Sequence, residues 1–130
     1  METHLLDSFK QTADGQRAEQ ILRKCVHCGF CTATCPTYQL TGDELDGPRG
    51  RIYQIKEMLE GQNIGSETQL HLDRCLTCRA CETTCPSGVN YAELVDIGRQ
   101  YIADKGYRNR FQKFYRKLIL QVVPYPERMQ

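Results

Sequence analysis

Eight cysteines are the residues of this 130-residue chain with the clearest chemical potential, and they form two groups with the same spacing. Each group reads C-x2-C-x2-C-x3-C-P, and the second begins fifty residues after the first. The groups are Cys25, Cys28, Cys31 and Cys35, then Cys75, Cys78, Cys81 and Cys85. Three thiolates at intervals of three residues can wrap around three irons of a cuboidal iron–sulfur cluster, which needs four ligands. The pattern therefore predicts two [4Fe–4S] clusters held by all eight thiols.

Zinc and disulfides are the alternatives for such a cysteine set. A structural zinc site usually joins two separated C-x2-C pairs, and four cysteines within eleven residues crowd that geometry. Disulfides need an oxidising compartment, whereas the first ten residues have no charged start followed by a long apolar run, as a secretory signal would. The spacing favours iron–sulfur clusters, with zinc second and disulfides last, in a reducing compartment inside the cell.

Helices are expected to lead into both cysteine groups. Asp14 is a candidate cap for a helix that ends near Cys25. Ser66, with Gln69 three residues later, has the form of a capping box for a helix that ends near Cys75.

Two more helices are expected around these. After a polar loop at residues 37–47, Pro48 opens a segment with apolar residues at helical spacing, which Gly61 closes. Another apolar stripe begins after Asn90 and ends at Gly106. No clear alternating pattern of a strand is present, so the fold class is predicted to be mainly α.

This layout resembles the α-helical ferredoxins, because forty positions separate Cys35 from Cys75 whereas the β-rich bacterial ferredoxins have a short linker. In two-cluster ferredoxins the cysteine before proline ligates the other cluster. The resemblance implies the following ligand sets: Cys25, Cys28, Cys31 and Cys85 for cluster 1, and Cys75, Cys78, Cys81 and Cys35 for cluster 2.

Other titratable side chains give weaker signals. His27 and Arg79 lie inside the two cysteine loops and could raise a cluster potential by favouring its more negative reduced state, but a solvated position is favoured for both. The acidic run at residues 43–46 is interpreted as a solvated loop rather than a cation site. No catalytic constellation and no nucleotide-binding glycine motif appears. The chain is therefore not expected to be catalytic alone.

The last part of the chain is basic and amphipathic. Residues 25–90 contain five basic and eight acidic side chains, whereas residues 91–130 contain eight and four. One face of the expected tail helix carries Phe111, Phe114, Tyr115, Leu118, Ile119 and Val122, and the basic residues Arg108, Arg110, Lys113, Arg116 and Lys117 lie mostly off it. Docking on protein is favoured over peripheral contact with an anionic membrane. No nucleic-acid motif accompanies the charge, so no nucleic-acid partner is expected.

Three stretches closely resemble the iron–sulfur subunit of bacterial glycolate oxidase (glycolate dehydrogenase). They are residues 25–61 (CVHCGFCTATCPTYQLTGDELDGPRGRIYQIKEMLEG), residues 72–99 (LDRCLTCRACETTCPSGVNYAELVDIGR) and residues 121–124 (QVVP). The resemblance implies partner subunits containing FAD, which oxidise glycolate to glyoxylate, and electron transfer through this chain toward a quinone-type acceptor. A freestanding ferredoxin-like carrier, or a subunit for another 2-hydroxy acid such as lactate, is the alternative.

The resemblance also implies a domain plan. Residues 1–15 form an N-terminal extension, residues 16–106 the dicluster domain, and residues 107–130 a basic tail. Members of the resembled family continue with two further cysteine-rich segments that are absent here, so we expect this chain to correspond to an N-terminal portion. The expected location is the cytoplasm, with peripheral contact on the cytoplasmic face of the inner membrane as the alternative.

Overall fold

The structure is a computed structural model that describes residues 1–62, 65–105 and 110–125. These residues form helices and connecting loops, and no strand occurs among them. The α-helices are α1 (Asp7–Lys10), α2 (Ala13–Lys24), α3 (Pro36–Thr41), α4 (Pro48–Leu59), α5 (Ser66–Asp73), α6 (Ala80–Thr83), α7 (Tyr91–Lys105) and α8 (Arg110–Val122), and the short 3-10 helices are η1 (Phe30–Thr32) and η2 (Glu44–Asp46). The prediction of a mainly α fold is confirmed.

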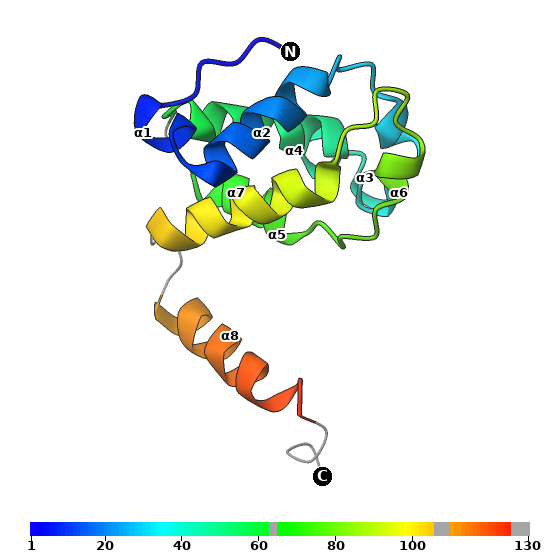
Figure 1. The fold of residues 1–130 in the computed structure, drawn as a ribbon. Coiled ribbons are helices and arrows are strands. Elements are labelled where there is room, and N and C mark those ends of the chain that lie inside the picture. The colour runs from blue at the N-terminus through cyan, green and yellow to red at the C-terminus, as the bar shows by residue number, and fades with distance from the viewer. Residues whose placement is uncertain (63–64, 106–109, 126–130) are drawn as a thin grey trace.

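Helix α7 is the centre of the helical body, because α2, α4 and α5 all pack on it (Figure 1). The side chains between these helices are fully buried and aliphatic, and they include Leu22, Ile55, Leu72, Leu94 and Ile102. The short elements η1, α3 and α6 gather at one end of this body, where the two cysteine loops lie (Figure 1). Burial of the long helices therefore fixes the frame from which both loops extend.

The start of α2 differs from the sequence prediction. Thr12, not Asp14, is the N-cap: its backbone is extended and its hydroxyl accepts a hydrogen bond from the Gly15 N–H at 3.0 Å. Asp14 lies in the first turn of the helix, where a carboxylate interacts favourably with the positive end of the helix dipole.

The start of α5 also corrects a prediction. Gly65 is the N-cap and Ser66 is already helical, so the expected capping box does not form. The Gln69 amide instead donates to the Gln112 side chain of α8 at 3.3 Å. Helix α4 begins at Pro48 as predicted, since proline has no N–H to leave unpaired at this position. The expected polar loop at residues 37–47 contains part of α3 and all of η2.

The first residues of the chain pack on the helical body. Leu5 belongs to the hydrophobic core, and the Leu6 N–H donates to the Leu59 carbonyl at 3.0 Å. The expected boundary between residues 15 and 16 falls inside α2. The other expected boundary, at residues 106 and 107, and the basic residue Arg108 lie outside the described residues.

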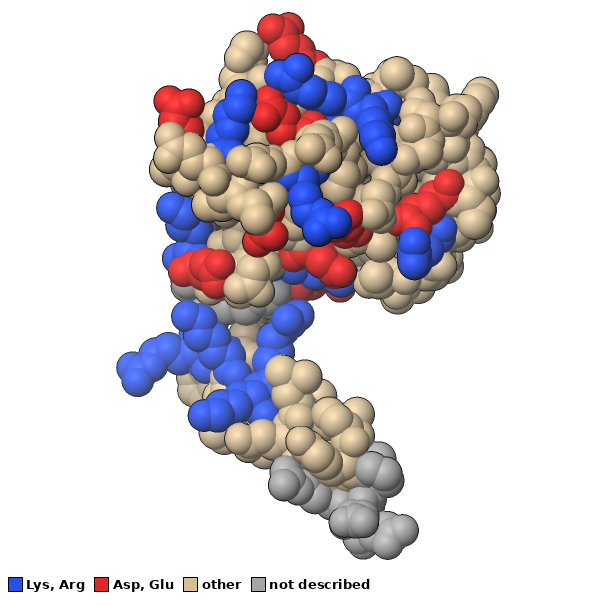
Figure 2. All heavy atoms as spheres, viewed as in Figure 1, with Lys and Arg blue, Asp and Glu red and all other residues tan. Residues whose placement is uncertain are grey.

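Helix α8 extends away from the body (Figure 1). Its apolar side chains are exposed. Its body-facing contacts include an ion pair between Arg116 and Asp73 at 3.1 Å and the Gln69–Gln112 bond. Figure 2 shows the basic side chains of α8 gathered near the body. In the described part of the chain, no helix combines the length and apolar character needed to cross a membrane.

We predict that Gly50→Ala destabilises the fold. A methyl group at Gly50 in α4 would overlap the Glu44 carbonyl of η2, which is backbone and cannot swing away. Overpacking of this kind costs about 1–3 kcal/mol, more than the roughly 1 kcal/mol that alanine gains over glycine in a helix. The apparent melting temperature of the cluster-loaded protein, followed by circular dichroism at 222 nm, should fall by several degrees.

The control is Gly65→Ala, because a methyl group there would meet nothing closer than 3.8 Å. Loss of a glycine N-cap costs at most about 1 kcal/mol. Equal melting temperatures for Gly50→Ala and the parent protein would contradict the packing argument.

Candidate metal centres

The first cysteine loop starts where α2 ends, at its C-cap Cys25. The backbone then turns through two left-handed residues, His27 with φ 57° and Gly29 with φ 85°. Gly29 suits that conformation, and its carbonyl accepts the Thr32 hydroxyl at 2.7 Å. The turns bring Cys28 to the surface while Cys25 stays buried.

The second loop repeats this path at the positions fifty residues later. Thr77 and Arg79 are left-handed, with φ 55° and 61°, although neither is glycine. Such a conformation is unfavourable for residues with a side chain unless the surroundings impose it. The repetition of the same turns in both loops indicates that the spacing of the cysteines, rather than local preference, dictates the backbone.

Arg99 of α7 holds the second loop in place. Its guanidinium donates to the Cys75 carbonyl at 2.6 Å, to the Leu72 carbonyl at 2.9 Å and to the Thr77 hydroxyl at 3.0 Å. Sequence reasoning missed this residue. The signal was available, because Arg99 falls four residues after Val95 and three before Ile102, on the buried face of a helix.

The eight cysteines line two adjoining cavities. The first is lined by Cys25, Cys28, Cys31, Cys81 and Cys85, and the second by Cys35, Cys75, Cys78 and Cys81. Each cavity thus receives three cysteines of one repeat and the proline-flanked cysteine of the other, with Cys81 facing both. The structure therefore brings all eight predicted site residues together.

Two threonines at equivalent repeat positions meet where the loops adjoin. The Thr84 hydroxyl donates to the Thr34 hydroxyl at 3.3 Å, and both approach the Ala80 carbonyl. Since η1 also packs on α6, the contact fixes one loop against the other.

Three of the cavity thiols, Cys25, Cys31 and Cys81, are disfavoured as free thiolates because their pKa values are raised. Burial raises the pKa of Cys25 and of Cys31, and neighbouring thiolates raise both further. Burial, followed by the charges of Cys31, Cys75 and Cys35, raises the pKa of Cys81 to about 12. Only a strong positive charge among these sulfurs would keep them ionised together, and the irons of a cluster supply it.

The surroundings of the His27 ring suit contact with a bound group better than contact with solvent. Its Nε2 is buried and, within the described part of the chain, is the one such side-chain nitrogen or oxygen without a hydrogen-bond partner. His27 also lines the first cavity. The expectation of a solvated side chain is therefore wrong for His27. For Arg79 it agrees with the structure, because this side chain is 65% exposed and pairs with Glu82 at 2.7 Å.

The donor set and the cavities together fit two iron–sulfur clusters. Thiolates are the usual ligands of such clusters, and cysteines from both loops line each cavity. His27, which lines the first cavity, has a buried Nε2 without a hydrogen-bond partner among the described residues.

A buried charge network supports the second cavity, and sequence reasoning did not foresee it. Asp46 is fully buried, and its carboxylate contacts His71 Nδ1 at 2.8 Å, Arg74 at 2.9 Å and Arg51 at 3.5 Å. Burial alone would raise the pKa of Asp46, but the hydrogen bonds from His71 and Arg74 lower it below its usual value. The interpretation of residues 43–46 as a solvated loop is wrong for Asp46.

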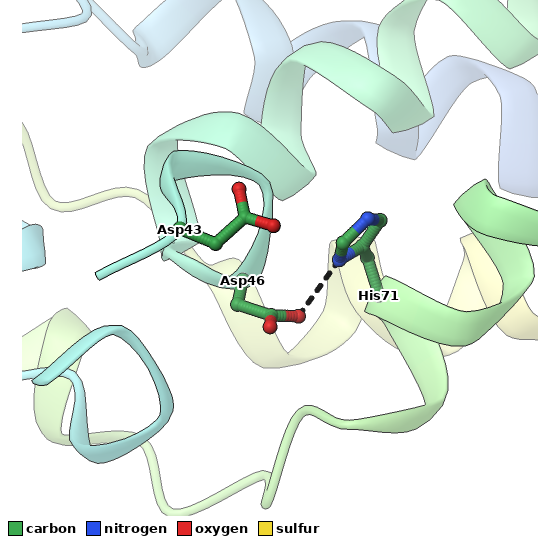
Figure 3. A group of neighbouring side chains, drawn as sticks. All are labelled: Asp43, Asp46 and His71. Carbon is green, nitrogen blue, oxygen red and sulfur yellow. Dashed lines mark hydrogen bonds and ion pairs between the residues drawn. The ribbon is translucent and has the colours of Figure 1, made fainter. Parts of the chain in front are cut away.

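Asp43, Asp46 and His71 place ligand-type atoms within 4.8 Å of one another (Figure 3). The Asp46 carboxylate already pairs with the guanidinium groups of Arg51 and Arg74 and with the His71 ring. The Asp43 carboxylate accepts the Leu45 N–H at 2.9 Å. This group of three side chains is therefore explained as part of a network of ion pairs and hydrogen bonds.

This network reaches the cysteines through Thr37. The buried Arg51 donates to the Thr37 hydroxyl at 3.1 Å, and that hydroxyl lies 3.2 Å from Cys35 Sγ. The network therefore positions the segment that carries Cys35 into the second cavity.

Comparison with known proteins gives a family match and several relatives. The family model described as "4Fe-4S dicluster domain" matches residues 21–89. The chain is 60% identical to the glycolate oxidase iron–sulfur subunit of Escherichia coli K12, over 97% of this chain and 31% of that protein. It is 36% identical to the probable glycolate oxidase iron–sulfur subunit of Bacillus subtilis 168, over 95% of this chain and 28% of that protein.

A more distant relative is an Hdr-like menaquinol oxidoreductase iron–sulfur subunit of Archaeoglobus profundus, 29% identical over 82% of this chain and 23% of that protein. The chain spans less than a third of the length of these three relatives. All three are named as iron–sulfur subunits.

We predict that removal of iron unfolds much of the helical body. Cys25 and Cys81 belong to the hydrophobic core, so removal of the iron leaves empty cavities inside the packing. Anaerobic treatment with an oxidant and a chelator should abolish most of the helical signal at 222 nm and the cooperative melt. Reconstitution with iron and sulfide should restore both, with lower yield as the pH falls, because protons compete with iron for the thiolates.

The control is the same treatment without chelator. An iron-free protein that keeps its full helical signal and melts cooperatively would contradict this prediction.

Proposed function

The chain belongs to the 4Fe–4S dicluster domain family and is an electron-transfer iron–sulfur protein with two [4Fe–4S] clusters, and we propose how its cysteines divide between them. Cys25, Cys28, Cys31 and Cys85 hold cluster 1, and Cys75, Cys78, Cys81 and Cys35 hold cluster 2. The observation that carries this assignment is the lining of the two cavities. Cys81 lines both, and we place it in cluster 2 because its repeat partner Cys31 lines the first cavity alone.

In this proposal the protein supplies geometry and surroundings. When bound, each cluster takes up and releases one electron at a time. The crossing of Cys35 and Cys85 between the loops keeps the two sites adjacent, and Arg99 and the Thr34–Thr84 contact fix the loops. Cys28 and Cys78 are exposed, so each site has a sulfur at the surface for transfer to and from a partner.

We propose that the electrons come from a partner subunit containing FAD that oxidises glycolate to glyoxylate. Glycolate gives two electrons and two protons to such a flavin, which can release the electrons singly. The support is the 60% identity to a glycolate oxidase iron–sulfur subunit. A quinone-type acceptor is the proposed destination, and its support is limited to a relative whose name includes menaquinol, the reduced form of such a quinone.

We further propose that α8 docks on a partner subunit, with the chain in the cytoplasm. The helix exposes Phe111, Phe114 and Tyr115 by 63–75%, and its charged side chains are all basic. Protein docking is preferred because such stripes more often cover protein, and peripheral membrane contact is the alternative.

We predict that Cys35→Ser damages cluster 2 although Cys35 belongs to the first repeat. Loss of one thiolate should remove or convert the cluster held by the second loop, and Cys85→Ser, the matched control, should do the same to cluster 1. EPR of the dithionite-reduced variants, with iron and sulfide counts, measures the loss in each case. Damage confined to the cluster of the variant's own repeat would show that the ligand assignment is reversed.

We predict that glycolate reduces both clusters in the presence of the FAD-containing subunits. The components are mixed anaerobically, and cluster absorbance and EPR are followed after glycolate is added. Partner subunits alone must first reduce their flavin, and lactate is tested in parallel because it is the competing 2-hydroxy acid.

Reduced flavin beside oxidised clusters, both with this chain and with a longer form that carries the further cysteine-rich segments of its relatives, would reject the glycolate proposal. Reduction by lactate alone would reassign the substrate.

A further inference from the structure

Tyr91 occupies a position shared by the two candidate metal centres. It is the first residue of α7, only 5% of its surface is exposed, and its ring lines both cavities. Its hydroxyl donates a hydrogen bond to Cys75 Sγ at 3.6 Å, a distance suited to sulfur. A buried tyrosine hydroxyl without a partner would be costly, so this bond explains why tyrosine can occupy the site.

From this contact we propose that Tyr91 tunes cluster 2, raising its reduction potential through the hydrogen bond to Cys75. The proposal rests on the cluster assignment above and goes beyond it. A donor aimed at a ligand sulfur stabilises negative charge there, and the reduced cluster is the more negative state. Tyr91 is thus a positioning residue that acts through Cys75.

The contact is held rigidly. The Tyr91 N–H donates to the Val89 carbonyl at 2.9 Å, and Leu94 and Val95 anchor the same helix in the core. On the other side, Arg99 of α7 donates to the Cys75 carbonyl at 2.6 Å. Helix α7 therefore holds the sulfur-bearing residue and the hydroxyl donor at once, so their separation cannot easily change.

The two centres differ in this respect. Among the described residues, the side-chain hydroxyl contacts to cysteine sulfur are those of Tyr91 with Cys75 and Thr37 with Cys35, and both cysteines line the second cavity. The first cavity has the backbone N–H of His27 near Cys25, which lowers the pKa of that thiol against the larger effect of burial. Removal of the Tyr91 hydroxyl should therefore affect one centre and leave the other almost unchanged.

The test is a redox titration of the anaerobically prepared, cluster-loaded protein, followed by EPR, for the parent and for Tyr91→Phe. Phenylalanine keeps the buried ring and removes only the donor. We expect about a tenfold shift of one reduction equilibrium toward the oxidised state, equivalent to about 59 mV for one electron. The potential that shifts should be that of cluster 2, the cluster that Cys35→Ser damages. ENDOR should also show an exchangeable proton coupled to this cluster in the parent and missing from the variant.

Tyr101→Phe is the matched control. Tyr101 lies on the same helix, its ring contacts Phe9 at a centroid distance of 5.3 Å, and it lines neither cysteine cavity. Its variant should reproduce the parent potentials.

Three results for Tyr91→Phe would each overturn the inference: unchanged potentials, an equal shift of both cluster potentials, or a shift of the cluster 1 potential alone. Loss of iron and sulfide from Tyr91→Phe would assign the residue a structural role and overturn it as well. No partner subunit is present in the titration, so its outcome is separate from that of the glycolate experiment.

Discussion

The fold depends on the meeting of two cysteine loops around two adjoining cavities, which burial makes unfavourable for free thiolates such as those of Cys25, Cys31 and Cys81. Each cavity is lined by three cysteines of one repeat and the proline-flanked cysteine of the other, with Cys81 lining both, and burial followed by nearby thiolates raises the pKa of Cys81. Iron bound among them reverses this effect, since each thiolate then faces positive charge. Because each cavity draws on both loops, the same attraction also joins the two repeats. The clusters thus do the work that a larger hydrophobic core would do in a longer chain.

The helices could be predicted because their apolar spacing and the cysteine repeat are local properties of the sequence. Helices α2, α4, α5 and α7 lie where expected. Details that depend on three-dimensional contacts could not be predicted. Thr12 rather than Asp14 caps α2, since the chain enters from α1, which packs on α2. The Gln69 side chain bonds to Gln112 of α8 instead of capping the start of α5, because Gln112 comes within reach only in the folded chain.

The candidate site shows the same division. The cysteine spacing predicts the ligands, since three cysteines of each ligand set come from one short loop. The residues that hold them come from elsewhere: Arg99 and Tyr91 from α7, and Arg51 from α4. In the sequence, Asp46 resembles a solvated acid because it closes an acidic run that begins with Asp43 and Glu44. Its burial follows from pairing with arginines 5 and 28 residues away and with a histidine 25 residues away, which no local pattern encodes.

The two repeats are alike in ligands and unlike in support, and this difference bears on electron flow. Gly29 and Arg79 occupy equivalent loop positions. The Tyr91 hydroxyl donates to a sulfur of the second cavity, whereas the Thr37 hydroxyl near Cys35 donates to the Asp46 carbonyl. Hydrogen bonds and charge near the sulfurs set the potential of a cluster. Two clusters with the same four thiolates but unequal donors should therefore have unequal potentials. A pair of equal potential would pass electrons equally in both directions, whereas a step between them favours one. The repeat supplies two adjacent carriers, and the effect proposed for Tyr91 would give transfer between them a preferred direction.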